Sequence, residues 1–200
     1  MPIFPYGGRE TAHLTKRDPA LGKVIKQIGR IEREIEPDLV AALIRSIIGQ
    51  QISSKAAATV RRRLRDMLGA ITPERIAAVP VEEIQACGMS MRKAGYVKGI
   101  AEAALDGRLD ARAVAQLDDA GVIAALTGLQ GVGVWTVEML LIFSLCRPNV
   151  LSWGDLAIRR GIMKLYGLET LDKKEFAALH ERYAPHASVA SLYLWEYSAL

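Results

Sequence analysis

The stretch Leu126–Gly161, LTGLQGVGVWTVEMLLIFSLCRPNVLSWGDLAIRRG, decides how this chain is interpreted. It opens with a glycine turn, Gly131-Val132-Gly133, which leads into an apolar run with helical spacing. Further along, Asp155 stands at the head of a second run with helical spacing. Aspartate directly before a helix is a common N-cap, so capping alone is one interpretation of Asp155. The stretch therefore predicts a helical hairpin followed by a helix that begins after an aspartate.

The glycine turn has the chemistry of a phosphate clamp. Glycine permits positive φ and the close approach of another backbone. The helix that follows presents its first N–H groups and the positive end of its dipole, which favour an anion. Such a hairpin grips a phosphate without reading sequence, and we expect contacts from Gly131, Gly133, Val134 and Thr136. The motif alone is equally typical of helical hairpins that turn on glycine for packing.

Outside this stretch, helical periodicity dominates the chain. Residues 40–48 carry their apolar side chains at i, i+3, i+4, i+7 and i+8, a strong amphipathic helix signal. Glycine, proline and capping residues divide the sequence into about ten such segments, and no segment alternates like a strand. The predicted fold class is all-α.

Composition narrows the function classes without fixing one. The 200 residues carry a net charge of +4, with 17 Lys and Arg against 10 Asp and Glu in residues 1–100. This is weak evidence for a polyanionic partner, because a solvated helix face explains such charges equally well. The basic residues gather notably at Lys55, Arg61, Arg62, Arg63 and Arg65.

The remaining signals concern compartment and metals. No apolar run reaches the ~18 residues of a membrane span, and we expect no secretory signal and no membrane partner. Two cysteines and three histidines without metal-ligand spacing exclude a disulfide framework and a cysteine cluster. A reducing intracellular location, cytoplasm or nucleoid, is expected.

Taken together, the motifs resemble the helix-hairpin-helix DNA glycosylase superfamily. The hairpin Leu129–Thr136 (LQGVGVWT) and the segment Trp153–Arg159 (WGDLAIR) carry this resemblance. The alkylation-repair branch, the 3-methyladenine DNA glycosylases of bacteria and yeast, is the most similar. It matches through Ile48–Ser53 (IGQQIS), Gly88–Ala94 (GMSMRKA) and Leu194–Tyr197 (LWEY). The resemblance spans roughly residues 38–197.

The resemblance implies a specific architecture. We expect residues 1–200 to form a single helical glycosylase domain of two lobes, without the N-terminal β-domain of the longer bacterial enzyme. One lobe would comprise residues 32–145 and end in the helix-hairpin-helix, and the other would comprise residues 1–31 and 146–200. A cleft between the lobes would hold the flipped base, with Asp155 at its lip.

The resemblance also implies a reaction. Asp155 is at the position of the superfamily's catalytic aspartate, where a carboxylate stabilises an oxocarbenium-like sugar and orients water. Bifunctional members carry a nucleophilic lysine where this chain has Trp135, so the chain resembles a monofunctional enzyme without lyase activity. No second acid is evident to protonate the leaving base. That suits cationic alkylated bases such as 3-methyladenine and 7-methylguanine.

Further site residues follow from the same resemblance. A cationic base favours aromatic walls, and Trp135, Trp195 and Trp153 are pocket candidates, although core packing explains them too. Met139 is another pocket position, where the bacterial inducible enzyme has a third aromatic residue. A flipped base leaves a gap in the duplex, and Gln50, Gln51 and Ser53 match the loop that fills it, with Gln51 as the wedge; a plain polar loop is the alternative.

The expected DNA contacts and ions complete the hypothesis. Additional phosphate contacts are expected from Ser90, Arg92 and Lys93, and an optional Na⁺ or K⁺ from the carbonyls of Thr127, Leu129 and Val132. No cofactor is required, and the partner is double-stranded DNA containing alkylated bases, bound by a monomer. Two alternatives stay open: a glycosylase for neutral damaged or mismatched bases, and a non-enzymatic DNA-binding module.

Overall fold

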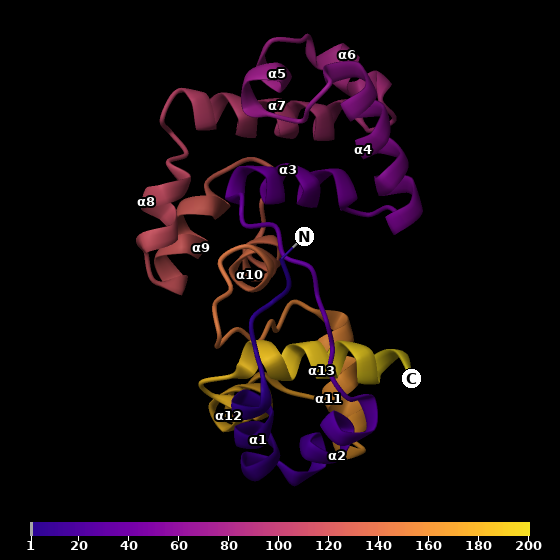
Figure 1. The fold of residues 1–200 in the computed structure, drawn as a ribbon, viewed down its shortest axis with the longest axis vertical. Helices are drawn as coiled ribbons and strands as arrows, with labels where there is room; N and C mark the ends of the chain where they lie inside the picture. The colour runs from indigo at the N-terminus through magenta and orange to yellow at the C-terminus, as the bar shows by residue number, and fades with distance from the viewer. Residues whose placement is uncertain (1) are drawn as a thin grey trace. The chain divides into compact units, whose positions relative to one another are not determined.

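The computed structural model describes residues 2–200, which form thirteen α-helices (Figure 1). Over this range there is no strand, only an isolated antiparallel bridge between Ile3 and Glu34. The predicted all-α class is confirmed, but the predicted number of about ten helices was too low. No helix in the described range is long and apolar enough to cross a membrane.

Two helices were missed by the sequence analysis, α1 (Gly8–Arg17) and α8 (Ala111–Gln116). Each buries a single side chain, Leu14 in α1 and Val114 in α8. One buried position produces no helical period in the sequence, so the sequence pattern does not indicate a helix here. Packing against neighbouring helices stabilises these two segments.

The chain divides into two compact units. Unit 1 comprises Met1–Ile35 and Leu141–Leu200, and unit 2 comprises Glu36–Leu140. The sequence placed the lobe boundaries at residues 31/32 and 145/146. Both arms of the chain thus belong to unit 1, and unit 2 is inserted between them. Helix α10 (Val134–Phe143) continues from one unit into the other.

Unit 2 is built around helices α3 and α7, which pack together. Leu43 and Ile47 of α3 and Val97 of α7 are fully buried, as the apolar spacing of residues 40–48 predicts. The shorter helices α5 and α6 pack on α7, and α4 packs on α3. The helices, besides α8 and the first part of α10, are α3 (Leu39–Gly49), α4 (Ser54–Leu68), α5 (Pro73–Ala77), α6 (Val81–Ala86), α7 (Met91–Leu105) and α9 (Asp119–Thr127).

Unit 1 is built around helix α13 (Ala187–Ala199), whose residues 187–194 are all buried. It packs on α11 (Leu156–Tyr166) and α2 (Pro19–Ile28). At Gly161 of α11, a Cβ atom would overlap the backbone carbonyl of Leu194. Glycine is therefore required for the two helices to approach this closely. Helices α1 and α12 (Lys173–Tyr183) complete this unit.

A buried polar cluster joins three helices of unit 1. Asp18 caps α2, and its Oδ1 accepts the amides of Ala20 and Leu21 at 3.0 Å each. Its Oδ2 accepts the Tyr166 hydroxyl and, at 3.4 Å, a guanidinium N–H of Arg182. Burial is the main cause that raises the pKa of Tyr166 to about 12, with the bond to Asp18 acting in the same direction.

Candidate functional site

The glycine turn between α9 and α10 is shaped by its own backbone. The amide of Leu129 donates to the carbonyl of Leu126 at 3.1 Å, and that of Val132 to the carbonyl of Leu129 at 3.2 Å. Gly131 has φ +82°, and a Cβ there would overlap the ring of Tyr96. Both the backbone conformation and the Tyr96 contact therefore require glycine at this position.

Gly133 differs from Gly131 in its surroundings. A Cβ at Gly133 would meet no atom within 4 Å. This glycine directly precedes α10 and has no side chain to cap it, while the next two residues are exposed, Val134 by 52 % and Trp135 by 44 %. The start of α10 thus faces open space, as a phosphate contact at Gly133, Val134 and Thr136 would need. The side chain of Thr136 is buried, so its expected contact would be made by its backbone.

The loop between α3 and α4, which holds the expected wedge, is attached on two sides within unit 2. The Gln50 side-chain amide donates to the carbonyl of Gly131 at 3.0 Å, which links the loop to the glycine turn. The Lys93 ammonium donates to the carbonyls of Ile48 (3.2 Å) and Gln50, and its burial lowers the pKa of Lys93. Gln51, at the exposed tip, has φ +57°. The loop is therefore held on both sides while Gln51 projects.

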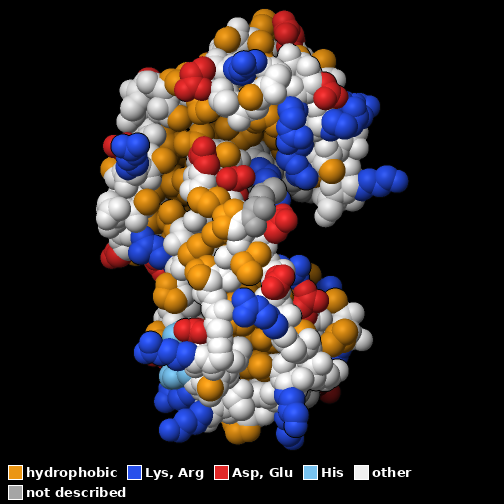
Figure 2. All heavy atoms as spheres, in the orientation of Figure 1, with side chains coloured by type: hydrophobic (Ala, Val, Ile, Leu, Met, Phe, Trp, Pro, Cys, Tyr) orange, Lys and Arg blue, Asp and Glu red, His pale blue; other side chains and the backbone are white. Residues whose placement is uncertain are grey.

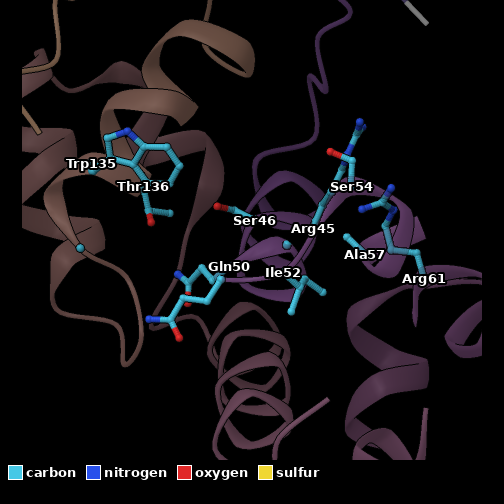
Figure 3. Close-up of a pocket in the computed structure, with 12 residues that line it drawn as sticks. Arg45, Ser46, Gln50, Ile52, Ser54, Ala57, Arg61, Trp135 and Thr136 are labelled. Atoms are coloured by element: carbon cyan, nitrogen blue, oxygen red, sulfur yellow. The ribbon is translucent and has the colours of Figure 1, made fainter. Parts of the chain in front are cut away.

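These two features border an open cavity of about 720 Å³ within unit 2. Trp135 and Thr136 lie on one side of it, and Arg45, Ser54 and Arg61 lie on the other (Figure 3). The structure thus brings together five expected site residues, Gln50, Gln51, Gly133, Trp135 and Thr136. The remaining lining residues are Arg45, Ser46, Gly49, Ile52, Ser54, Ala57 and Arg61.

Asp155 is the N-cap of α11 in unit 1, as one interpretation of the sequence expected. Its Oδ1 accepts the amides of Ala157 at 2.9 Å and Ile158 at 3.0 Å. The residue is only 6 % exposed. Two charge-assisted hydrogen bonds fix the orientation of this carboxylate, and the α11 dipole favours its negative charge. The site chemistry that the resemblance implies needs such a fixed, charged group.

The other pocket candidates have neighbours of their own. Trp195 packs against Phe143 with ring centroids 5.5 Å apart. The Trp153 ring meets Phe176 edge to face at 5.2 Å. Arg159 places its guanidinium over the Trp153 ring, 5.0 Å from the centroid. Met139, on α10, is half-buried. Base contacts by Trp195, Trp153 and Met139 stay predictions.

Two expected site residues, one of the wedge loop and one phosphate contact, serve as helix caps. The Ser53 hydroxyl accepts the Ala56 amide at 3.2 Å and begins α4, and the Ser90 hydroxyl accepts the Lys93 amide at 3.3 Å and begins α7. Arg92 is exposed. Lys93, already bonded to the loop carbonyls, has a structural role in addition to any phosphate contact. These contacts therefore stay predictions.

The sequence analysis missed half of the cavity wall. Arg45, Ser46, Ser54 and Ala57 were not expected there, and Arg61 was noted only as part of a basic run. One signal was present: Arg45 is the single charged residue in the apolar helix LVAALIRSIIG. A lone cation within an amphipathic helix marks either a solvated face or a site, and sequence alone does not separate the two.

Comparisons with known proteins place these features in a family. Residues 44–185 match the family described as HhH-GPD superfamily base excision DNA repair protein. DNA-3-methyladenine glycosylase 1 of Schizosaccharomyces pombe is 37 % identical over 94 % of this chain and 86 % of its own length.

Two solved structures are similar over nearly the whole chain. A DNA-3-methyladenine glycosidase from Bacillus halodurans has a TM-score of 0.86 and 34 % identity, covering 99 % of this chain and 93 % of that one. The S. pombe 3-methyladenine DNA glycosylase Mag1, in complex with abasic DNA, has a TM-score of 0.83 and 36 % identity, covering 96 % and 97 %. The chain therefore belongs to the HhH-GPD superfamily of base excision DNA repair proteins.

Proposed function

We propose that this chain is a monofunctional DNA glycosylase that removes alkylated bases from duplex DNA in base excision repair. Its substrates would be cationic bases such as 3-methyladenine and 7-methylguanine. One observation carries the proposal: the Asp155 carboxylate, which the family resemblance implies as the catalytic one, is buried and fixed by the amides of Ala157 and Ile158. The names of the S. pombe and B. halodurans relatives support the same substrate class.

The reaction would need little beyond this carboxylate. Cleavage of an N-glycosidic bond develops positive charge on the sugar, and a preorganised anion stabilises that charge. Asp155 would do so and would orient the attacking water, which takes the place of the base at the sugar carbon. A cationic base leaves as a neutral molecule, so it needs no protonation. Trp135 has no amine to form a Schiff base, so the strand would stay intact.

The DNA would be held by groups of unit 2. The start of α10, preceded by Gly133, offers backbone amides and a helix dipole to one phosphate. Gln51, at the tip of the fixed loop, would enter the duplex where the base is removed, and its amide can hydrogen-bond the unpaired partner base. The Na⁺ or K⁺ that the family resemblance implies would bind the carbonyls of Thr127, Leu129 and Val132. The Leu129 carbonyl already accepts the Val132 amide, which leaves this oxygen a second lone pair.

Base release from methylated duplex DNA tests the proposal. Purified wild type and Asp155→Asn are incubated with the DNA, released bases are separated, and strand nicks are counted before and after alkali. We expect 3-methyladenine release by wild type only, with nicks appearing only after alkali. Nicks without alkali would contradict the monofunctional assignment. Intact DNA binding without any base release would favour a binding module. Release of hypoxanthine from a second duplex that contains it, without release of 3-methyladenine, would favour the other substrate class.

A further inference from the structure

The cavity of unit 2 has a strongly one-sided charge. Among its twelve lining residues are two arginines, Arg45 and Arg61, and no carboxylate. On the opposite side of the cavity is the start of α10, where the helix dipole adds positive potential. A cavity with positive groups on both walls concentrates anions.

Arg61 is set apart from the other arginines of α4. Burial is the first cause that lowers the pKa of Arg61, followed by the positive charges of Arg45 and Arg65. Its neighbour Arg62 instead pairs with Asp66 at 3.1 Å on an exposed helix face. In the described part of the chain no carboxylate pairs with Arg61. The positive charges of Arg45 and Arg65 therefore act on Arg61, and a bound anion would offset them.

The same arrangement is visible at the surface. Figure 2 shows Lys and Arg side chains gathered over the part of unit 2 where α4 lies in Figure 1. The arginines lie across the cavity from the start of α10 (Figure 3). The glycine turn is next to the same cavity, because Gln50 lines the cavity and donates to the Gly131 carbonyl. An extended polyanion lying along the start of α10 would meet the arginines without leaving unit 2.

We propose that Arg45 and Arg61 form a second phosphate-binding site for DNA, across the cavity from the glycine turn. The hairpin would hold one phosphate through backbone amides, and the arginine wall would hold another through guanidinium groups, with the wedge loop between them. Arginine suits this role because its planar fork matches phosphate oxygens. This inference rests on the proposed function only in taking DNA as the polyanion.

Salt-dependent binding to undamaged duplex DNA tests the second site. Affinity is measured by fluorescence anisotropy for wild type, Arg45→Gln, Arg61→Gln and the double variant, from about 50 to 200 mM NaCl. Each lost phosphate contact should reduce the slope of log K against log salt by about 1 and weaken binding roughly tenfold near 100 mM. The matched control is Arg62→Gln, which removes the same charge from the same helix and should leave the slope unchanged.

The outcomes separate this inference from the proposed function. Equal slopes for wild type and both single variants would overturn the second site, whatever the base-release result. A reduced slope in a protein that releases no base would keep the site and overturn the glycosylase. If Arg62→Gln lowers the salt slope as much as Arg61→Gln does, the effect comes from net charge alone and the second site is overturned.

A second variant covers the case in which Arg61→Gln does not fold, as judged by circular dichroism. Arg61→Lys then decides: a wild-type slope supports the site, and a slope equal to that of the folded Arg45→Gln overturns the role of the Arg61 charge.

Discussion

Two helix N-termini in this molecule are built in opposite ways. Helix α11 begins after Asp155, whose carboxylate accepts the amides of Ala157 and Ile158. Helix α10 begins after Gly133, which has no side chain that could accept an amide. The first helix end is satisfied from within and holds a negative charge in place. The second has no side-chain cap from the residue that precedes it, and in the proposed function its amides would meet a phosphate. Under the proposed function, the same element of secondary structure would serve chemistry where an aspartate caps it and DNA binding where a glycine precedes it.

The largest expected effect comes from removing the charge of the capped end. Asn is as good an N-cap as Asp, so Asp155→Asn should keep the fold while losing the anion. We expect the single-turnover rate of base release to fall at least about 100-fold, with DNA affinity and melting temperature little changed. Quenched reactions on methylated duplex and a thermal melt measure these quantities.

Asp18→Asn is the matched control for Asp155→Asn. It removes a carboxylate from another buried N-cap, that of α2, which also accepts Tyr166 and Arg182. We expect this variant to lose stability but to release base at the wild-type rate below its melting temperature. A rate loss in Asp18→Asn as large as in Asp155→Asn would mean that Asp155 acts through structure alone.

The next effect comes from converting the open helix end into a capped one. Gly133→Asp supplies a side-chain acceptor where a Cβ meets no atom within 4 Å, so the fold should tolerate it. The new carboxylate would occupy the amides and repel phosphate, and we expect DNA affinity to fall roughly 100-fold, in line with two lost or reversed charge contacts. Anisotropy with undamaged duplex measures the change.

Gly133→Asn separates capping from charge in this test. It offers a similar cap without the negative charge, and we expect a loss of affinity between those of wild type and Gly133→Asp. Wild-type affinity in both variants would show that the start of α10 binds no phosphate.

A smaller effect is expected for the two glycines of the turn when stability is compared. Gly131→Ala places a Cβ at φ +82° against the ring of Tyr96 and should cost about 1–3 kcal/mol of unfolding free energy. Gly133→Ala should change the unfolding free energy by less than about 0.5 kcal/mol, because a Cβ there would meet no atom within 4 Å. Urea unfolding measures both. Adding Tyr96→Ala to Gly131→Ala should cost less than the sum of the two changes, since the overlap is then removed; strict additivity would refute the contact.

The smallest effect concerns how stability depends on pH at the other buried N-cap, Asp18, which accepts the Tyr166 hydroxyl. The pKa of Tyr166 is raised from 10.0 to about 12 in the folded protein. The stabilisation by its protonated hydroxyl is therefore complete below pH 10 and is lost as the pH rises toward about 12. We expect the wild-type melting temperature to fall over this range and Tyr166→Phe to show a weaker fall. Identical pH profiles would exclude Tyr166 as a source of the alkaline instability.

The sequence allowed prediction of features that depend on local patterns. The apolar spacing of residues 40–48 predicted α3, and the position of Asp155 before an apolar run predicted its capping role, which the structure confirms. The family resemblance added the reaction. Local patterns were insufficient where distant residues meet. The bond from Lys93 to the carbonyl of Gln50 joins residues 43 positions apart, and the arginine wall depends on how α4 packs on α3. No period or motif encodes these contacts.

The insertion of unit 2 between the two arms of unit 1 has a consequence for synthesis. A ribosome completes Glu36–Leu140 before it makes Leu141–Leu200, and compact units generally fold as they emerge. Unit 2, with its hairpin and wedge loop, has all of its residues while residues 2–35 still await α11 and α13. Asp155 arrives only with the second arm. Under the proposed function, a nascent chain would thus have its DNA-binding groups before it has the carboxylate that acts on the base.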